Sequence, residues 1–220
     1  FPAKPAGKIK KPAVVSADAP EFVQNVTAVI MAQKGDSLPV SAIPEDGTWP
    51  SATTQYEKRN IAVEIPVWGP EACIQCMQCS LVCPHAAIRG KVYPADALKG
   101  APATFKSAEL KPLLAKAFPG QKYTIQCAPE DCTGCGLCVK VCPMAAKGAL
   151  GLKEQIPLRV PEAANWKFFR SLPQPDTSVL GMTVLVSQFR RPLFEFSGAC
   201  AGCGETPYVK LMTQLFGNRM

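Results

Sequence analysis

Eight of the eleven cysteines in this 220-residue chain lie in two short runs of one pattern. The first run, CIQCMQCSLVCP, spans residues 73–84, and the second, CTGCGLCVKVCP, spans residues 132–143. Cysteines three residues apart seldom have disulfide geometry, and an odd total of eleven cannot all pair within the chain. The runs therefore indicate thiolate ligation of metal in a reducing compartment.

Both runs match Cys-x2-Cys-x2-Cys-x3-Cys-Pro, the spacing in which each fourth cysteine ligates the other of two 4Fe-4S clusters. This spacing assigns Cys73, Cys76, Cys79 and Cys142 to cluster 1, and Cys132, Cys135, Cys138 and Cys83 to cluster 2. Pro84 and Pro143 would turn the chain at the two crossovers and remove an amide donor. The expected activity is one-electron transfer at low potential.

The residues around the cysteines predict tight loops in an apolar setting. Gly134 and Gly136 allow the second loop to approach its cluster closely, whereas the first loop has Gln75, Met77 and Gln78. Seven apolar neighbours are expected to exclude water: Ile74, Leu81, Val82, Ile88, Leu137, Val139 and Val141.

Zinc is the main alternative, because Cys-x2-Cys pairs are common zinc ligands. Zinc sites usually separate their cysteine pairs by a longer segment, and two crowded runs that both end in proline disfavour them. Cys127 is expected to be a buried free thiol on the same strand side as Ile125, with a ligand role as the alternative. His85 is expected to be a surface or packing histidine rather than one that tunes a cluster.

A third pair, Cys200-x2-Cys203, lies in the glycine-rich stretch FSGACAGCGETPY at residues 196–208. A phosphate-binding loop is one alternative, but the Walker lysine is absent. Two cysteines do not complete a metal site, so either further ligands lie outside this sequence or the pair is redox-active. The end of the sequence soon afterwards, at Met220, favours missing ligands.

The remaining sequence predicts an α+β protein with short elements. Phe22, Val26, Val29 and Ile30 have helical spacing after Pro20 and before Gly35. Residues 61–68 alternate as a strand with Ile61, Val63, Ile65 and Val67 on one face, and 88–93 and 123–127 are further strands. A helix is expected over about 106–118, which Pro112 interrupts or delays, and another follows Thr206 as N-cap and Pro207 as N1. Residues 150–192 are punctuated by proline and are expected to be irregular.

The charge of +7 would suit nucleic acid or an anionic surface. Two ligated clusters of about −2 each would reduce it to about +3, so a nucleic-acid partner is not expected. No apolar stretch reaches the roughly 18 residues of a membrane span. The start, FPAKPAGKIKKP, lacks Met and a signal-peptide core and is interpreted as a cut or truncated end.

Three stretches resemble the single-chain 2-oxoacid oxidoreductases, specifically the pyruvate:ferredoxin (flavodoxin) oxidoreductase family. They are QYEKRNIAV at 55–63, similar to the family's Glu-Lys-Arg region; the double cysteine motif; and EFSGACAGCGETPY at 195–208, similar to the entry into its thiamine diphosphate domain. With GDSLPVSAIPEDG, the resemblance covers about residues 20–220. Asp46-Gly47 is a turn, and the family's Gly-Asp-Gly…Asn thiamine and magnesium motif is absent from this sequence.

The resemblance implies an internal segment of a larger homodimeric enzyme that converts pyruvate and coenzyme A to acetyl-CoA and carbon dioxide. Cys200 and Cys203 would be two of four ligands of a third 4Fe-4S cluster, completed with thiamine diphosphate and magnesium by residues outside this chain. No residue here is expected to be catalytic. The acceptor would be ferredoxin, flavodoxin or a fused flavin domain, and the compartment cytoplasmic, or mitochondrial for a eukaryotic fusion.

The implied division is a linker (1–19), a helix with the Glu-Lys-Arg region (20–67), a bacterial two-cluster ferredoxin-like domain (68–150), a connector (151–192) and the start of the thiamine domain (193–220). Two alternatives remain open. One is the same segment of a fused pyruvate:NADP oxidoreductase, and the other is a stand-alone ferredoxin-like electron carrier.

Overall fold

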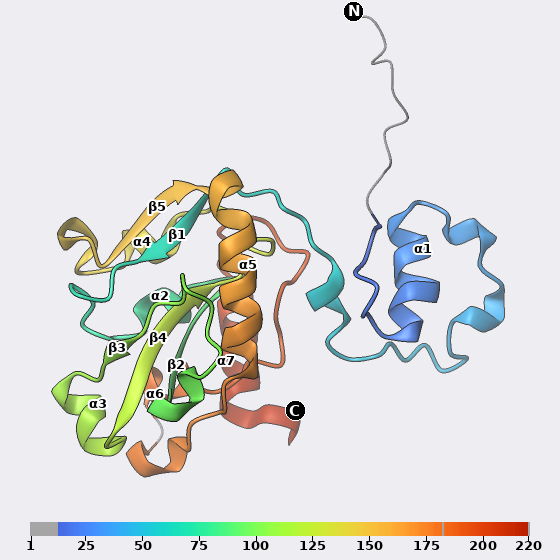
Figure 1. Cartoon of the computed structure of the whole chain (residues 1–220). Helices are drawn as coiled ribbons and strands as arrows, with labels where there is room; N and C mark the ends of the chain where they lie inside the picture. The colour runs from blue at the N-terminus through green and yellow to red at the C-terminus, as the bar shows by residue number, and fades with distance from the viewer. Residues whose placement is uncertain (1–12, 182, 220) are drawn as a thin grey trace, which may run out of the picture. The chain divides into compact units, whose positions relative to one another are not determined.

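The computed structural model describes residues 13–181 and 183–219, so most of the expected linker at 1–19 lies outside the described residues. The chain divides into two compact units, one up to Lys58 and one from Arg59 onward (Figure 1). Both cysteine runs lie in the second unit. Among the described residues, no helix is long and apolar enough to cross a membrane.

The first unit is built around one helical segment. A π-helical turn at Val23–Thr27 runs into α1 (Ala28–Met31). Val23 and Val26 are buried, whereas Ile30, expected on the same face, is 42% exposed. The π-helical turn explains the difference, because its extra residue per turn rotates the residues that follow it away from the buried face. Three single 3-10 turns complete the unit, at Gly35–Ser37, Val40–Ala42 and Thr53–Tyr56.

Two antiparallel strands, β1 (Glu64–Trp68) and β5 (Leu150–Glu154), form the smaller sheet of the second unit. Trp68 pairs with Leu150 and Glu64 with Glu154. The predicted strand at 61–68 is therefore confirmed only from Glu64. Ile61 and Val63, expected on one strand face with Ile65 and Val67, lie before β1 and are 57% and 80% exposed, whereas Ile65 is buried.

A three-stranded antiparallel sheet has the order β2–β4–β3. It consists of β2 (Ile88–Pro94), β4 (Gln121–Cys127) and β3 (Ala108–Glu109), with Ile88 paired to Cys127. The strands predicted at 88–93 and 123–127 are confirmed. The helix expected over 106–118 starts late, as α3 (Pro112–Ala117) with Pro112 at its first position, where the missing amide costs no hydrogen bond.

The expectation of an irregular segment over 150–192 is wrong, because α5 extends from Gln155 to Ser171. The prolines misled the prediction: Pro161 lies inside the helix, where a lost hydrogen bond is tolerated. Burial compensates for it, since Asn165, Trp166 and Phe169 are buried at helical spacing. Trp166 stacks on Phe169, with ring centroids 5.1 Å apart.

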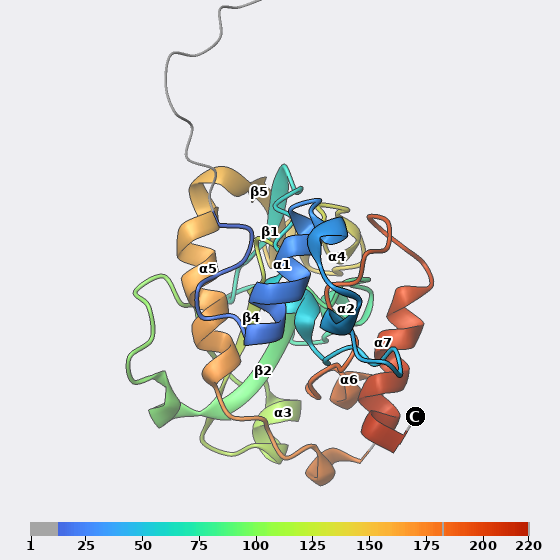
Figure 2. The same cartoon turned by 90° about the vertical axis from the view of Figure 1, so that its right-hand side faces the viewer.

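Two further helices, α6 (Val184–Ser187) and α7 (Thr206–Phe216), complete the unit. Thr206 is the first helical residue and Glu205 the N-cap, so the expected cap at Thr206 is wrong by one position. In Figure 2, α5 and α7 lie on opposite sides of the second unit, with β2, β4, α2 and α4 between them. The main core between these layers contains cysteines from both runs as well as Tyr123 and Phe189.

Candidate metal centres

The two cysteine runs fold into tight loops of the same backbone shape. Gln75 and Met77 have φ of 61° in the first loop, and Gly134 and Gly136 have φ of 68° and 74° in the second. Each loop leads into a single helical turn, α2 (Gln78–Leu81) or α4 (Leu137–Lys140). Left-handed positions in such loops turn backbone N–H groups toward the inside, where they form an anion-binding concavity.

Each loop borders a cavity that also receives the last cysteine of the other run. Cavity 1 is lined by Cys73, Cys76, Cys79 and Cys142. Cavity 2 is lined by Cys132, Cys135, Cys138 and Cys83. The structure thus brings together the same two sets of four that the spacing predicted. The exchange arises because α2 and α4 lie in contact, and each leads the chain out of its own loop.

Backbone amides point at the cysteine sulfurs in both loops. The Gln75 amide donates to Cys73 Sγ, and the Gly134 amide donates to Cys132 Sγ, each at 3.4 Å. The Ala87 amide donates to Cys83 Sγ at 3.2 Å, just after the first crossover. Donors directed at sulfur stabilise the thiolate form, which is the form that ligates metal.

Burial opposes that thiolate form at two cysteines in the centre of the core. Burial raises the pKa of Cys138 to about 12 and raises the pKa of Cys79 still further, and neighbouring cysteines add to both effects. A metal-bound thiol is deprotonated outright, because the cation supplies the opposite charge. The buried sulfurs therefore need bound iron to exist as thiolates.

The residues present fit 4Fe-4S clusters. In each set four cysteines line one cavity, as the four corners of a cubane require. Among the described residues, no three His, Cys, Asp or Glu side chains converge on a site for a single metal ion. The buried indole Nε1 of Trp68 lines cavity 1, and within the described part of the chain it has no hydrogen-bond partner of standard geometry. A bound sulfide or thiolate would supply the acceptor that this donor lacks.

One of the residues expected to exclude water from the sites is more exposed than predicted. Ile74, expected to exclude water, lines cavity 1 but is 48% exposed. Its side chain therefore covers the cavity only in part and presents an apolar edge to solvent. Ile88 is buried and lines cavity 2, as expected.

His85 is a packing residue, and it is buried rather than on the surface. It lines cavity 2, and its ring nitrogens lie 3.2 Å from Ser197 Oγ and 3.2 Å from the Cys200 carbonyl oxygen. Burial lowers its pKa, with the Cys200 carbonyl opposing that effect. His85 therefore connects the crossover after Cys83 to the loop of the third cysteine pair.

The Cys200-x2-Cys203 loop lies against the second cysteine loop. A Cβ added at Gly202 would lie 3.7 Å from Cys135 Cβ, so the two loops lie close together. Cys203 precedes α7, and the amides of Thr206 and Glu205 at the helix start lower its pKa. The pair therefore lies beside cavity 2, and Cys200 is exposed to solvent.

Sequence reasoning missed Lys210, which lies in α7 and is 1% exposed. Its Nζ donates to the backbone carbonyls of Ser80, Leu81 and Cys83, at the end of α2. Burial lowers the pKa of Lys210 to about 8, and Cys83 counteracts this most. A lysine within an otherwise apolar stretch, YVKLMTQLF, was the available signal.

A second buried cation, Arg89, was also missed. It forms an ion pair with Glu195 and lies over the rings of Trp166 and Phe196, with its Cζ 5.2 and 5.4 Å from the ring centroids. Burial lowers the pKa of Arg89, and Glu195 counteracts this. This pair joins β2 to the stretch before Cys200, so it holds the third cysteine pair in place.

Comparison with known proteins shows two profiles that match parts of the chain and several relatives that it resembles. A profile described as a 4Fe-4S dicluster domain matches residues 72–146, and the EKR profile, described as a domain of unknown function, matches residues 8–62. Pyruvate-flavodoxin oxidoreductase of Nostoc sp. is 55% identical over 93% of this chain and 17% of its own length. The chain is similar to a segment of such oxidoreductases.

Two more relatives support the resemblance predicted from the sequence. Pyruvate:ferredoxin oxidoreductase of Moorella thermoacetica is 53% identical over 100% of this chain and 18% of its own length. The mitochondrial pyruvate dehydrogenase [NADP(+)] of Euglena gracilis is 46% identical over 90% of this chain and 11% of its own length. The chain thus spans less than a fifth of the curated relatives that it matches, and its α+β ferredoxin-like part agrees with the dicluster profile.

Proposed function

We propose that this chain is the electron-transfer segment of a pyruvate:ferredoxin or pyruvate:flavodoxin oxidoreductase. The overall reaction takes pyruvate and coenzyme A to acetyl-CoA, carbon dioxide, a proton and two electrons. The observation that supports it most is the exchange of the fourth cysteine between two cavities, within a chain 55% identical to a pyruvate-flavodoxin oxidoreductase. 4Fe-4S clusters, when bound, supply one-electron transfer.

The proposed ligands of cluster 1 are Cys73, Cys76, Cys79 and Cys142, and those of cluster 2 are Cys132, Cys135, Cys138 and Cys83, as lined up around cavities 1 and 2. The loop amides of Gln75 and Gly134 hold the first sulfur of each set. Lys210 anchors the chain between Cys79 and Cys83, which belong to different sets. The protein thereby holds the two sites at a set separation and excludes water from the side of the main core.

Cys200 and Cys203 are proposed as two of the four ligands of a third cluster. Because their loop contacts His85 and lies close to Cys135, cluster 2 is the nearer relay to it and cluster 1 the farther one. The partly exposed Ile74 beside cavity 1 then marks the side from which electrons leave the segment. Thiamine diphosphate and magnesium would be bound by parts of the parent polypeptide outside this chain.

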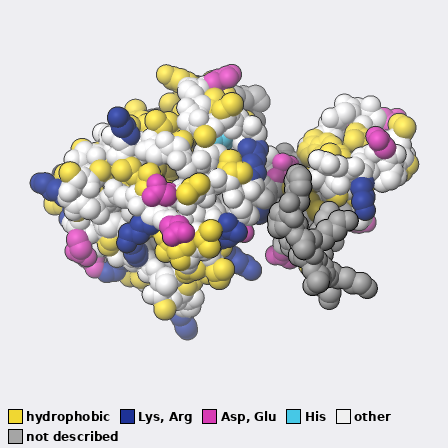
Figure 3. Space-filling model, turned by 90° about the horizontal axis from the view of Figure 1, so that it is seen from above, with side chains coloured by type: hydrophobic (Ala, Val, Ile, Leu, Met, Phe, Trp, Pro, Cys, Tyr) yellow, Lys and Arg dark blue, Asp and Glu magenta, His cyan; other side chains and the backbone are white. Residues whose placement is uncertain are grey.

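The wider context is part of the proposal. We propose the division 1–19, 20–67, 68–150, 151–192 and 193–220 within a larger multidomain, homodimeric enzyme of a reducing compartment, the cytoplasm. Ferredoxin or flavodoxin is proposed as acceptor, as in the names of the bacterial relatives. Basic and acidic side chains are interspersed with apolar ones on the face drawn in Figure 3, which suits a small acceptor protein better than nucleic acid.

The fused pyruvate:NADP oxidoreductase remains a second candidate, because the Euglena gracilis relative bears that activity in its name. It is the less supported one, since the bacterial relatives are more similar over more of the chain. The two would share this segment and differ only in the final acceptor.

Iron and acid-labile sulfide should be counted in the anaerobically purified protein, and EPR spectra recorded after dithionite reduction. We expect about eight irons with equal sulfide from cavities 1 and 2, and a spectrum of two interacting reduced clusters. A third cluster in the longer polypeptide would add about four of each. Zinc without sulfide would overturn the proposal. Reduction of the clusters on addition of pyruvate and coenzyme A to the full-length protein tests the substrate separately.

A further inference from the structure

Two residues stand at equivalent places just before the cysteine loops. Trp68 is the last residue of β1 and Cys127 the last residue of β4, and each precedes its loop's first cysteine by five positions. Both are 4% exposed. Trp68 lines cavity 1 and Cys127 lines cavity 2.

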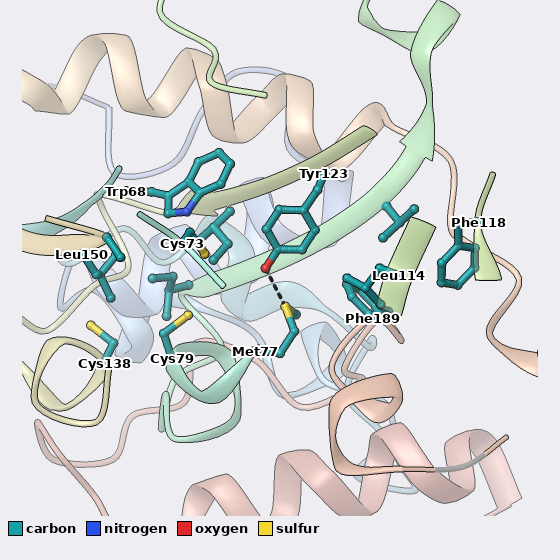
Figure 4. Packing of buried hydrophobic residues seen from close by; sticks show 14 residues of the cluster. Trp68, Cys73, Met77, Cys79, Leu114, Phe118, Tyr123, Cys138, Leu150 and Phe189 are labelled. Carbon is teal, nitrogen blue, oxygen red and sulfur yellow. Dashed lines mark hydrogen bonds between the residues drawn. The ribbon is translucent and has the colours of Figure 1, made fainter. Parts of the chain in front are cut away.

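The indole N–H of the Trp68 side chain points toward cavity 1. In Figure 4 the indole lies beside Cys73, with its nitrogen on the edge that faces the Cys73 side chain. The buried indole Nε1 has no hydrogen-bond partner of standard geometry among the described residues, so it is free to donate into cavity 1. The ring is held by an edge contact with Tyr123, at 5.8 Å between centroids, so its orientation is set by packing.

Cys127 has the corresponding place at the second site. It is a free thiol among the residues that line cavity 2, together with Cys132. Four other cysteines already line that cavity, so Cys127 is placed to donate its S–H to a ligand sulfur and is not needed as a fifth ligand.

We propose that Trp68 and Cys127 are positioning residues that set the reduction potentials of clusters 1 and 2 independently, by donating a hydrogen bond to sulfur at each site. This inference rests on the ligand sets proposed above. A reduced cluster carries one more negative charge than the oxidised one, so a donor to its sulfur favours reduction and raises the potential. An indole N–H is a stronger donor than a thiol S–H, so Trp68 has the larger effect.

The test is a redox titration, followed by EPR, of the cluster-loaded protein and its variants. Trp68→Phe keeps an aromatic ring and removes the donor. We expect one of the two couples to shift to lower potential, with about a tenfold smaller equilibrium constant for one-electron reduction, equivalent to about 59 mV. The other couple should stay unchanged. Trp166→Phe is the matched control, because this buried indole is not among the described residues that line cavity 1.

Cys127→Ala should lower the potential of the other couple, with an equilibrium constant for reduction about threefold smaller. Cys127→Ser should lower that potential less, because serine keeps a hydrogen-bond donor. A result in which both variants shift the same couple, or neither shifts any, would overturn the inference. Shifts confined to different couples would support it.

Two measurements separate this inference from the proposed function. Equal iron and sulfide, at about eight each from these two sites, must first be found in the wild-type protein and in each variant. Pulsed EPR on reduced protein with ¹⁵N-labelled indole should show a nitrogen coupling that disappears in Trp68→Phe and persists in Trp166→Phe. If the clusters are present and that coupling is missing from the wild-type protein, Trp68 is no donor, although the proposed function stands.

Discussion

The two cysteine loops have the same backbone and different side chains, and the difference follows from what each loop touches. In the first loop the left-handed positions are Gln75 and Met77, residues that bear a strain there. Gln75 Nε2 donates to the Glu109 carbonyl at 2.8 Å, and its Oε1 accepts from the Lys111 amide at 2.8 Å. Tyr123 donates to Met77 Sδ at 3.1 Å. These side chains tie the first loop to the segment inserted between the two runs.

The second loop has glycine at both left-handed positions, and at Gly134 the neighbouring chain also leaves little room for a side chain. A Cβ at Gly134 would lie 3.2 Å from the Glu64 carbonyl oxygen and 3.4 Å from Ala62 Cα. The stretch leading into β1 therefore lies directly on this loop. Side chains stabilise the first loop, whereas close backbone packing stabilises the second.

The helices that follow the loops differ in the same way. The last turn of α2 has no basic residue of its own and is capped by Lys210 from α7. The last turn of α4 contains its own Lys140. The first loop and its helix thus depend on side chains from distant segments, whereas the second loop depends on close backbone packing and its helix has a basic residue of its own.

The largest expected effect tests the exchange between the halves. Each single replacement of a proposed ligand by alanine should remove one cluster. Cys76→Ala with Cys142→Ala should remove cluster 1 alone and leave about four irons in the two sites, because both belong to one set. Cys76→Ala with Cys83→Ala should remove both clusters, because they belong to different sets. Iron and sulfide counts distinguish the two outcomes. If Cys76→Ala with Cys83→Ala removed one cluster and Cys76→Ala with Cys142→Ala removed both, each run would bind its own cluster.

Replacing Lys210 by methionine should have the next largest effect. It keeps the apolar stem but removes the donor from three buried carbonyls, so we expect a loss of about 2 kcal/mol of stability. Faster release of both clusters should accompany it, measured as bleaching of the cluster absorption under anaerobic denaturant. Lys140→Met, at the exposed end of α4, is the control, with an expected change within about 0.5 kcal/mol. Equal losses of stability in the two variants would show that α2 and α4 do not differ in how their last turns are stabilised.

A smaller effect is expected for alanine at the close contact of the second loop. Gly134→Ala introduces both a left-handed alanine and a contact with the Glu64 carbonyl. Gly120→Ala is matched, because its φ of 72° is similar and its Cβ would enter open space. Thermal unfolding should show a loss of about 2–4 °C for Gly120→Ala and about twice that for Gly134→Ala. Similar losses would mean that the close approach contributes nothing.

The smallest effect is expected for Gln75→Gly in the first loop. The change relieves the left-handed strain but removes the two hydrogen bonds to Glu109 and Lys111. We expect these terms to offset in part and leave a net loss of about 2 °C in the thermal midpoint. A gain in the midpoint would show that strain outweighs the contacts, and the first loop would then differ from the second without a structural benefit.

Much of the fold followed from local patterns, and the misses have physical causes. The strands at β2 and β4 and the start of α3 at Pro112 were predicted, because alternation and proline position are local signals. The helix α5 was missed because Pro161 suggested a break, although burial of Trp166 and Phe169 stabilises it. The exposed Ile61 and Val63 were misplaced because the alternation continued past the true start of β1.

The sequence by itself determined which chemistry this protein can perform. Four thiols within eleven residues, twice, predict two sets of ligands and their exchange, because short spacing limits which sulfurs a single loop can present. Only the tertiary structure decided what surrounds them. Trp68 in β1, Cys127 in β4 and Lys210 in α7 all lie against the cysteine loops. No local sequence pattern indicates these contacts, because only the packing of distant segments brings the residues together.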